Sequence, residues 1–349
     1  MPDTIVVYGA YGFAGRLVAQ EAIARGLTPH LAGRNAAKLQ AVAEELGCDH
    51  TALDVDDSAG LRALLTPATA VLHCAGPFLD TFAPMVQACL NTGTHYVDIT
   101  GEPRVFEACH ARDDEAREQG VMLLPGGAFD VVPTDCVSGM LKQRLPDATH
   151  LTLAVETSGG VSQGTMRTGS RYMTEGTLVR RDGVLTTRSD TPSMTLDFGF
   201  GPTEVTAATV GDVTTAWYST GIPNIEVFIA MPPSAKLMNK VPMIVKKFLA
   251  SRFGRVLVER QIRTMQAGPS DEARANGHAT AYGKATNDAG QSVELLLRTH
   301  EAYRFTAESI VEIGARVLRG EAPAGYQTPA MAYGPDFVLS LKGSKLVEV

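Results

Sequence analysis

A short glycine-rich segment near the N-terminus is the first feature that could do chemistry. Gly9, Gly12 and Gly15 repeat at every third position between an apolar run and an amphipathic stretch. Glycines allow positive φ and let backbone N–H groups approach a pyrophosphate, which the start of the following helix stabilises. A plain structural turn is the alternative, but a strand before, a helix after and a second strand about twenty residues on favour a nucleotide. The segment therefore predicts a dinucleotide site.

The end of the second predicted strand indicates which dinucleotide binds. NAD-binding domains usually place an acid there to accept bonds from the ribose, whereas this chain has Gly33, Arg34 and Asn35, and Lys38 follows. Arg34 and Lys38, four residues apart at a helix start, could clamp a 2′-phosphate, with no carboxylate there to repel it. Ordinary solvated charges are the alternative. We expect NADP(H).

The carboxyl ends of the other strands add further candidates, because ligands of such sheets bind outside those ends. The segments that follow the third to sixth strands are 53–55, 74–78, 98–102 and 125–130, and they are rich in Gly, Pro and acids. The residues expected to bind the coenzyme are Gly9, Tyr11, Gly12, Phe13, Ala14, Gly15, Arg16, Gly33, Arg34, Lys38, Asp54, Ala75, Gly76, Pro77, Phe78 and Thr100.

A proton donor is the second requirement of hydride chemistry, since the coenzyme carries the hydride itself. Asp98, Glu102 and Asp130 stand at strand ends and are the candidate catalytic residues. Each has a structural alternative: Asp98 and Glu102 could bind loop N–H groups or cap a helix at Pro103, and Asp130 could cap the next helix. No Tyr-x-x-x-Lys follows the fourth strand, and neither GxSxG nor HExxH occurs.

Substrate anchoring is expected from the second half of the chain. Thr165 would open a helix whose exposed N–H groups favour an anion, and Arg167, Arg171 and Tyr172 follow. The two arginines lie four apart and would suit a carboxylate. A solvated basic face is the alternative.

These residues are positioned by elements that the apolar pattern predicts. Short apolar runs at 4–8, 28–32, 70–74, 94–99 and 121–124 alternate with helical stretches at 13–25, 36–46, 83–91 and 104–118. This alternation is typical of a doubly wound parallel sheet with helices on both faces. Asn35 is expected to cap the second helix and Gly47 to end it.

From about Val132 the pattern changes to an α+β domain with a mostly antiparallel sheet. Strands are expected at 149–156, 177–187 with a turn at 182–183, 203–211, 224–231 and 277–298 with a turn at 288–290. Helices are expected at 133–145, 162–175, 234–253 and 303–318.

Composition excludes several other classes of protein. The 349 residues include 31 basic and 38 acidic side chains, a net charge of −7, which argues against a nucleic-acid binder or a polybasic membrane-surface protein. The sequence contains no run of 18 apolar residues, so it predicts no transmembrane segment. The five cysteines are widely spaced without CxxC, so we expect free thiols, no metal site and a cytoplasmic location.

The motifs together resemble the saccharopine dehydrogenase-like oxidoreductases. The resemblance rests on Gly9–Arg16, Ala32–Arg34, His73–Phe78, His95–Glu102 and Pro125–Asp135, with weaker similarity at Ser162–Thr165 and Gly325–Gly334. It implies an NADP-binding Rossmann domain at 1–132 with 323–349, and an inserted substrate-binding and dimerisation domain at 133–322. Members of this family include imine-reducing enzymes and trans-acting enoyl reductases.

We therefore expect an NADP(H)-dependent oxidoreductase that reduces a C=N or activated C=C bond of a small or carrier-bound metabolite. A homodimer is expected from the resemblance. The alternative from another class is a non-catalytic NADP(H)-binding sensor or partner-binding protein on the same fold.

Overall fold

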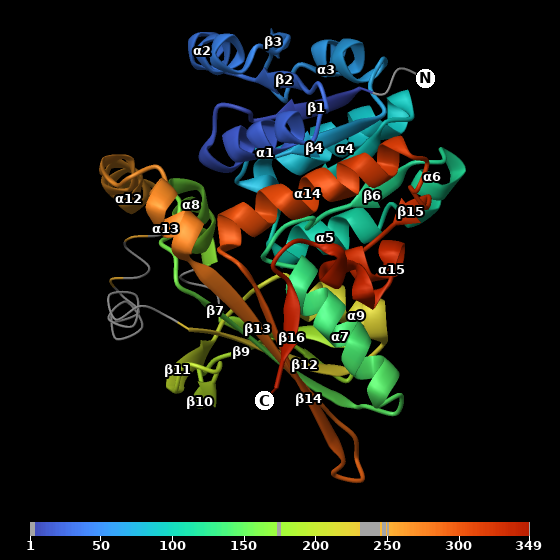
Figure 1. Cartoon of the computed structure of the whole chain (residues 1–349), viewed down its shortest axis with the longest axis vertical. Coiled ribbons are helices and arrows are strands. Elements are labelled where there is room, and N and C mark those ends of the chain that lie inside the picture. The colour runs from blue at the N-terminus through green and yellow to red at the C-terminus, as the bar shows by residue number, and fades with distance from the viewer. Residues whose placement is uncertain (1–3, 173–175, 231–244, 246–248, 250, 349) are drawn as a thin grey trace. The chain divides into compact units, whose positions relative to one another are not determined.

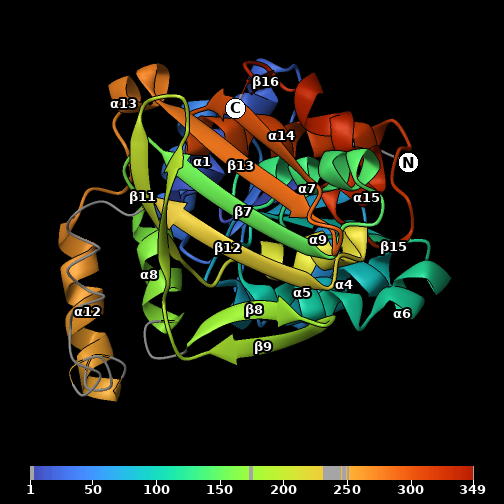
Figure 2. The same cartoon turned by 90° about the horizontal axis from the view of Figure 1, so that it is seen from below.

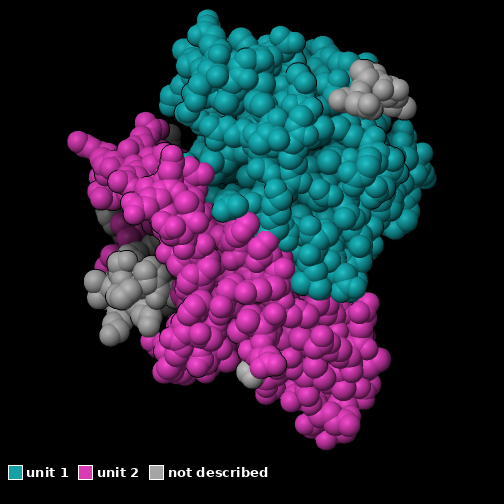
Figure 3. Space-filling model, in the orientation of Figure 1, with its two compact units in different colours: residues 1–132, 303–342 teal, residues 133–302, 343–349 magenta. Residues whose placement is uncertain are grey.

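Two sheets organise the chain (Figure 1). The computed structural model describes residues 4–172, 176–230, 245, 249 and 251–348. These fall into two compact units, coloured separately in Figure 3: residues 1–132 with 303–342, and residues 133–302 with 343–349. Each unit is described by itself below.

The first unit is built on a parallel sheet. Its seven described strands are ordered β15-β6-β5-β4-β1-β2-β3, which is the doubly wound order with one strand added at the β6 edge. The strands β1, β2, β4, β5 and β6 are largely buried and mostly apolar, as expected for strands covered on both faces, with His30, His73, His95 and Asp98 at strand ends. The strand bounds are β1 Ile5–Tyr8, β2 His30–Gly33, β3 His50–Ala52, β4 Ala70–His73, β5 His95–Asp98, β6 Met122–Leu124 and β15 Gly325–Tyr326.

Helices connect these strands and pack against them. α14, which comes near the end of the chain, crosses the sheet: an added Cβ on Gly314 would touch Ile5 and Leu72, and one on Gly127 would touch Ile313. The helices of this unit are α1 Phe13–Ala24, α2 Ala36–Leu46, α3 Ser58–Leu65, α4 Phe78–Thr92, α5 Pro103–His110, α6 Asp113–Glu118, α14 Ala302–Leu318, α15 Pro329–Tyr333 and the 3-10 helix η1 Pro335–Ser340.

The second unit is built on a mixed, mostly antiparallel sheet (Figure 2). Its described strands are ordered β10-β11-β12-β7-β13-β14-β16, and the hairpin β8-β9 joins at β12; only β7 and β12 pair in parallel. The bounds are β7 His150–Thr157, β8 Thr177–Arg181, β9 Val184–Arg188, β10 Ser193–Asp197, β11 Pro202–Ala207, β12 Asn224–Ala230, β13 His278–Thr286, β14 Ser292–His300 and β16 Lys345–Val347.

The faces of this sheet have different partners. On one face Ala154, Phe228, Tyr282 and Leu296 form a core with Phe198, Val205 and Ala207 of the β10–β11 hairpin. On the other face α7 packs closely, since a Cβ on Gly283 would meet Val137 and Leu141. The helices among the described residues of this unit are α7 Val132–Arg144, α8 Gln163–Tyr172, α9 Asp212–Thr220, α12 Arg252–Thr264 and α13 Asp271–Asn276.

The predicted fold class, a Rossmann sheet plus an α+β domain, is confirmed. Several element bounds were wrong. The expected helix 104–118 is two helices, α5 and α6, because residues 111 and 112 leave the helical path; α4 begins at Phe78 rather than 83; and the strand expected at 203–211 ends at Ala207. Most of the helix expected at 234–253 lies outside the described residues.

The compact units differ from the expected domain ranges at two places. Residues 303–322 lie in the first unit because α14 packs on the parallel sheet. Residues 343–349 lie in the second unit because β16 pairs with β14.

Candidate functional site

The loop between β1 and α1 is held by three glycines. Gly9 has φ +88°, and its N–H donates to the Ala32 carbonyl at 2.8 Å. A Cβ on Gly15 would collide with the Gly9 carbonyl oxygen, so the helix can approach the loop this closely only because residue 15 is glycine. Gly12 precedes the helix with extended backbone, φ −72° and ψ 163°. The loop therefore lies directly against the start of α1.

The start of α1 has no side-chain cap. Its first intrahelical bond runs from the Arg16 N–H to the Gly12 carbonyl at 2.9 Å, as at any helix start where the first N–H groups point out of the helix. No acid stands in the first turn. In the neighbouring helix α2, by contrast, the Asn35 side chain accepts from the Lys38 N–H. A dinucleotide pyrophosphate fits the uncapped end of α1.

Two basic side chains lie at the end of β2. Arg34 and Lys38 are both exposed, as a 2′-phosphate clamp requires, and the Tyr11 ring lies against Gly33. Arg16, another residue expected to bind the coenzyme, forms an exposed ion pair with Glu45 at 2.5 Å.

Two acids, Asp54 and Asp56, follow the neighbouring strand β3. Burial raises the pKa of Tyr8, and the charges of Asp54, Arg34 and Asp56 act on the same hydroxyl. Asp54 and Asp56 reach this region because β3 pairs with β2 and delivers the loop that follows it to the same edge.

The loop after β4 is held from two sides. The Phe78 N–H donates to Glu102 Oε1 at 2.7 Å, and the Thr81 hydroxyl donates to the Ala75 carbonyl at 2.8 Å. These bonds fix the position of Ala75, Gly76 and Pro77, which were expected to run along the coenzyme. Glu102, a candidate acid, is fully buried, and this bond gives it a positioning role.

His73 is a part of this arrangement that sequence reasoning did not include. Its Nε2 lies 2.9 Å from the Thr81 hydroxyl, whose proton is donated to Ala75, so Nε2 must carry the hydrogen and Nδ1 the lone pair. Burial lowers the pKa of His73 to about 3, so the ring is neutral. The signals in the sequence were a histidine at the end of a buried strand and its place in the motif His73–Phe78.

Asp98 joins the loops after β5 and β6. Its Oδ1 accepts from the Thr100 N–H at 2.9 Å and the Gly126 N–H at 2.8 Å, and its Oδ2 accepts from the Tyr96 hydroxyl at 2.6 Å. The side chain is fully buried. Burial raises its pKa to about 7, although these three hydrogen bonds lower it. This environment favours the structural alternative for Asp98.

Replacing Asp98 distinguishes a structural role of this residue from a catalytic one. Asp98→Ala leaves three buried donors without their acceptor, so we expect a loss of roughly 3 kcal/mol or more in unfolding free energy. Asp98→Asn keeps an acceptor for both N–H groups and should retain stability to within about 1 kcal/mol. Urea titrations measure both, with Asp130→Ala as the matched strand-end control that leaves stability unchanged.

The free energy of unfolding obtained from these titrations should fall as pH rises. The pKa of Asp98 is higher in the folded than in the unfolded chain. Its contribution to the free energy of unfolding is therefore complete below about pH 4 and is lost as pH rises through about 7. The Asn variant should lack this decline. Loss of turnover in a stable Asp98→Asn variant would contradict the structural role.

Asp130 differs from the other two acids. Its side chain is exposed and lies against Gly101, where an added Cβ would come within 3.1 Å of Oδ2. The protein around it nevertheless displaces enough water to raise the pKa of Asp130 to about 6. Among the described residues no hydrogen bond to its carboxylate supports the helix-cap alternative. Of the three candidate acids, Asp130 is the one whose side chain is exposed.

The expected substrate anchors are not brought together as predicted. Ser162 Oγ accepts from the Thr165 N–H at 3.2 Å, so the start of α8 is capped by a side chain. Arg167 donates to both oxygens of Glu259 on α12, at 2.9 and 3.0 Å, and its charge is thereby compensated. The side chains of Arg171 and Tyr172 lie outside the described residues.

Comparison with known proteins identifies the first unit. Residues 5–124, about a third of the chain, match the family described as the saccharopine dehydrogenase NADP binding domain. The match is thus a similarity of this segment to an NADP-binding domain. The matched segment contains β1 to β6 and every residue expected to bind the coenzyme.

Two kinds of named protein are similar to this segment in sequence. A saccharopine dehydrogenase-like oxidoreductase of Mus musculus is 36% identical over 154 residues, which cover 38% of this chain and 36% of that protein. A trans-acting enoyl reductase of Mycobacterium ulcerans is 33% identical over 142 residues, covering 38% of this chain and 33% of that protein. The match thus spans about a third of the length of each relative.

The fold of the chain is similar to that of a solved structure that matches along nearly its whole length. It is the apo, histidine-tagged saccharopine dehydrogenase (L-Glu forming) of Saccharomyces cerevisiae, with a TM-score of 0.62 and 12% identity over 99% of this chain and 100% of that one. The likeness shows that the two share a fold.

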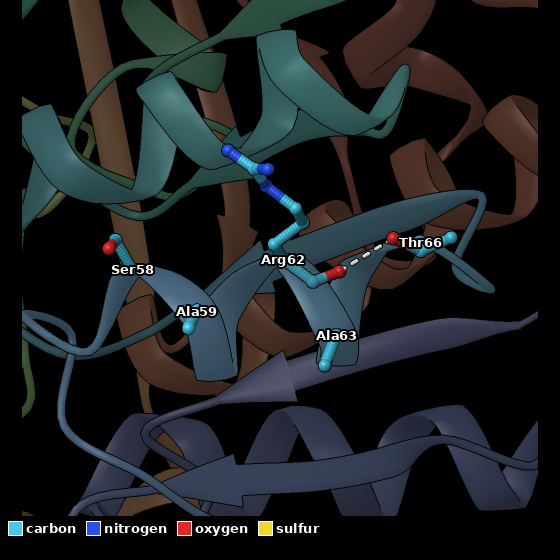
Figure 4. Close-up of a pocket in the computed structure, with 5 residues that line it drawn as sticks. All are labelled: Ser58, Ala59, Arg62, Ala63 and Thr66. Atoms are coloured by element: carbon cyan, nitrogen blue, oxygen red, sulfur yellow. Dashed lines mark hydrogen bonds between the residues drawn. The ribbon is translucent and has the colours of Figure 1, made fainter.

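Other surface features lie apart from the candidate site. A hollow at α3 is lined by Ser58, Ala59, Arg62, Ala63 and Thr66, none of them a predicted site residue (Figure 4).

Within the described ranges, no cluster of His, Cys, Asp and Glu side chains could hold a metal ion, and no helix is long and apolar enough to cross a membrane.

Proposed function

We propose that this protein is an NADP(H)-dependent oxidoreductase that transfers hydride to a C=N or activated C=C bond of a small or carrier-bound metabolite. The observation that carries the proposal is the uncapped, glycine-lined start of α1 beside the exposed Arg34 and Lys38. The similarity of residues 5–124 to an NADP-binding domain supports the choice of coenzyme.

The residues of this chain would divide the work between binding and proton transfer. The first-turn N–H groups of α1 would bind the pyrophosphate, and Arg34 with Lys38 the 2′-phosphate. The loop 74–78, fixed by Thr81 and Glu102, would line the nicotinamide side. When bound, the coenzyme supplies the hydride. Asp130 would give the proton that completes the reduction, because its carboxyl is exposed and its pKa is about 6.

Arg34→Ala tests the coenzyme assignment. Loss of one charge-assisted contact with the 2′-phosphate should weaken NADPH binding by about 1–3 kcal/mol, roughly 5- to 150-fold, and leave NADH binding nearly unchanged. Calorimetric titration of both coenzymes measures this difference.

Arg62→Ala, which removes an exposed arginine from α3, is the matched control and should bind both coenzymes normally. Equal losses for NADPH and NADH in Arg34→Ala would contradict the clamp.

The compensated charge of Arg167 keeps the non-catalytic alternative in consideration. A sensor would bind NADPH tightly without oxidising it in the presence of any imine or enoyl thioester. Turnover with one such compound decides for the enzyme.

A further inference from the structure

The outer face of α12 is apolar and exposed. Phe253, Val256 and Leu257 keep 80%, 65% and 55% of their surface exposed. With Arg260 they occupy positions i, i+3, i+4 and i+7, which form one stripe along a helix. The opposite side faces the protein, because Gly254 and Ile262 are buried. The helix is therefore amphipathic with its apolar stripe directed away from the unit that carries it.

This orientation is fixed by polar contacts on the inner side. Glu259 forms the two-bond ion pair with Arg167 of α8 and also accepts from Arg263 at 2.9 Å. Gln163 of α8 donates to the Met265 carbonyl at 2.8 Å, just beyond the end of α12. The two helices lie side by side in both views of the unit (Figures 1 and 2). These contacts hold α12 with the stripe outward.

The charge of α12 is opposite to that of the whole chain. The helix contains Arg252, Arg255, Arg260 and Arg263 but one acid, Glu259, whereas the protein has a net charge of −7. In the sequence just before it, residues 236–247 add four lysines and no acid. The net charge of the whole chain argued against a polybasic membrane-surface protein. That average does not show the local excess of basic residues in and just before α12.

We propose that α12 is an interfacial helix that binds the surface of anionic lipid membranes. Exposed apolar side chains would enter the boundary between headgroups and acyl chains, and the net positive charge of the helix would attract the anionic headgroups. The stem of Arg260 can lie along the stripe while its guanidinium reaches the headgroups. Pairing of α12 with α12 of a second copy is disfavoured because both helices carry the same positive charge. This proposal is independent of the coenzyme function.

Vesicle sedimentation of the full chain tests the proposal. We expect binding to vesicles of phosphatidylcholine with a third phosphatidylserine, at least about tenfold weaker binding to phosphatidylcholine alone, and loss of binding at high salt. The double variant Phe253→Ser/Leu257→Ser should bind at least about tenfold more weakly. Arg260→Glu should weaken binding by about tenfold or more.

Two matched controls should bind as the unchanged protein does. Val184→Ser removes an apolar side chain that is 64% exposed on β9, and Arg62→Glu reverses an exposed charge on α3. Calorimetry with NADPH should give the same affinity for every variant, so a failed membrane test says nothing against the coenzyme site.

Three results would overturn the proposal. They are equal binding to both kinds of vesicle, unchanged binding of the Phe253→Ser/Leu257→Ser variant, and conversion of a dimer to a monomer by that variant in light scattering without vesicles. The last result would assign the stripe to a contact between two copies of this chain.

Discussion

The Gly12→Asp variant is expected to lose NADPH and NADH binding while its stability stays near that of the unchanged protein. Residue 12 has the extended backbone of a helix-capping position, and a carboxylate there can accept from the first-turn N–H groups of α1. The same carboxylate would occupy the anion position and repel the pyrophosphate. Loss of two charge-assisted bonds corresponds to about 3 kcal/mol or more, a hundredfold in affinity.

Calorimetry and thermal unfolding measure the two effects on the same sample. An added Cβ at residue 12 would lie 3.1 Å from the Gly9 carbonyl oxygen, which a small shift of the loop accommodates. The matched control is Gly26→Asp, which adds the same charge just beyond the other end of α1. Gly26 has φ +80°, so that variant should lose about 1 kcal/mol of stability and still bind both coenzymes. Normal NADPH affinity in Gly12→Asp would reject the anion site.

Asp130→Asn is expected to reduce kcat by about 10²- to 10⁴-fold and to leave coenzyme affinity unchanged, because the amide cannot donate the proton that completes the reduction. Single-turnover oxidation of NADPH with an accepted imine or enoyl thioester measures the step directly. Glu118→Gln, which neutralises an exposed acid of the same unit, is the matched control with normal kcat.

The pH profile gives a second measure of the same group. The protonated carboxyl is the donor, so kcat for reduction should be constant below about pH 6 and fall about tenfold per pH unit above it. The Asn variant should lack this fall. A profile that is flat from pH 5 to 8 in the unchanged protein would remove Asp130 from the reaction.

Local signals in the sequence predicted the parallel sheet and its loops well. The capping of α2 by Asn35 and its end at Gly47, which has φ +66°, followed from residue types at neighbouring positions. The glycine loop was equally readable, because Gly15 is needed for a close contact with Gly9, six residues earlier in the chain. Such features depend on the residue types at adjacent positions, which can be read directly from the sequence.

The roles of the acids depended on distant partners. Asp98, Glu102 and Asp130 were equivalent by position, yet Asp98 bonds to Gly126 and Glu102 to Phe78, whereas Asp130 keeps an exposed carboxylate. Arg167 likewise meets Glu259, 92 residues further along the chain.

The sequence by itself thus predicted the parallel sheet with its alternating helices, the glycine-rich turn after the first strand and the basic residues at the end of β2. Only the tertiary structure decided which acid is exposed, that α14 packs on the first sheet, and that α12 directs its apolar stripe outward. The physical reason is that burial and ion pairing are properties of packed neighbours, and packing brings together side chains whose separation along the chain carries no periodic signal.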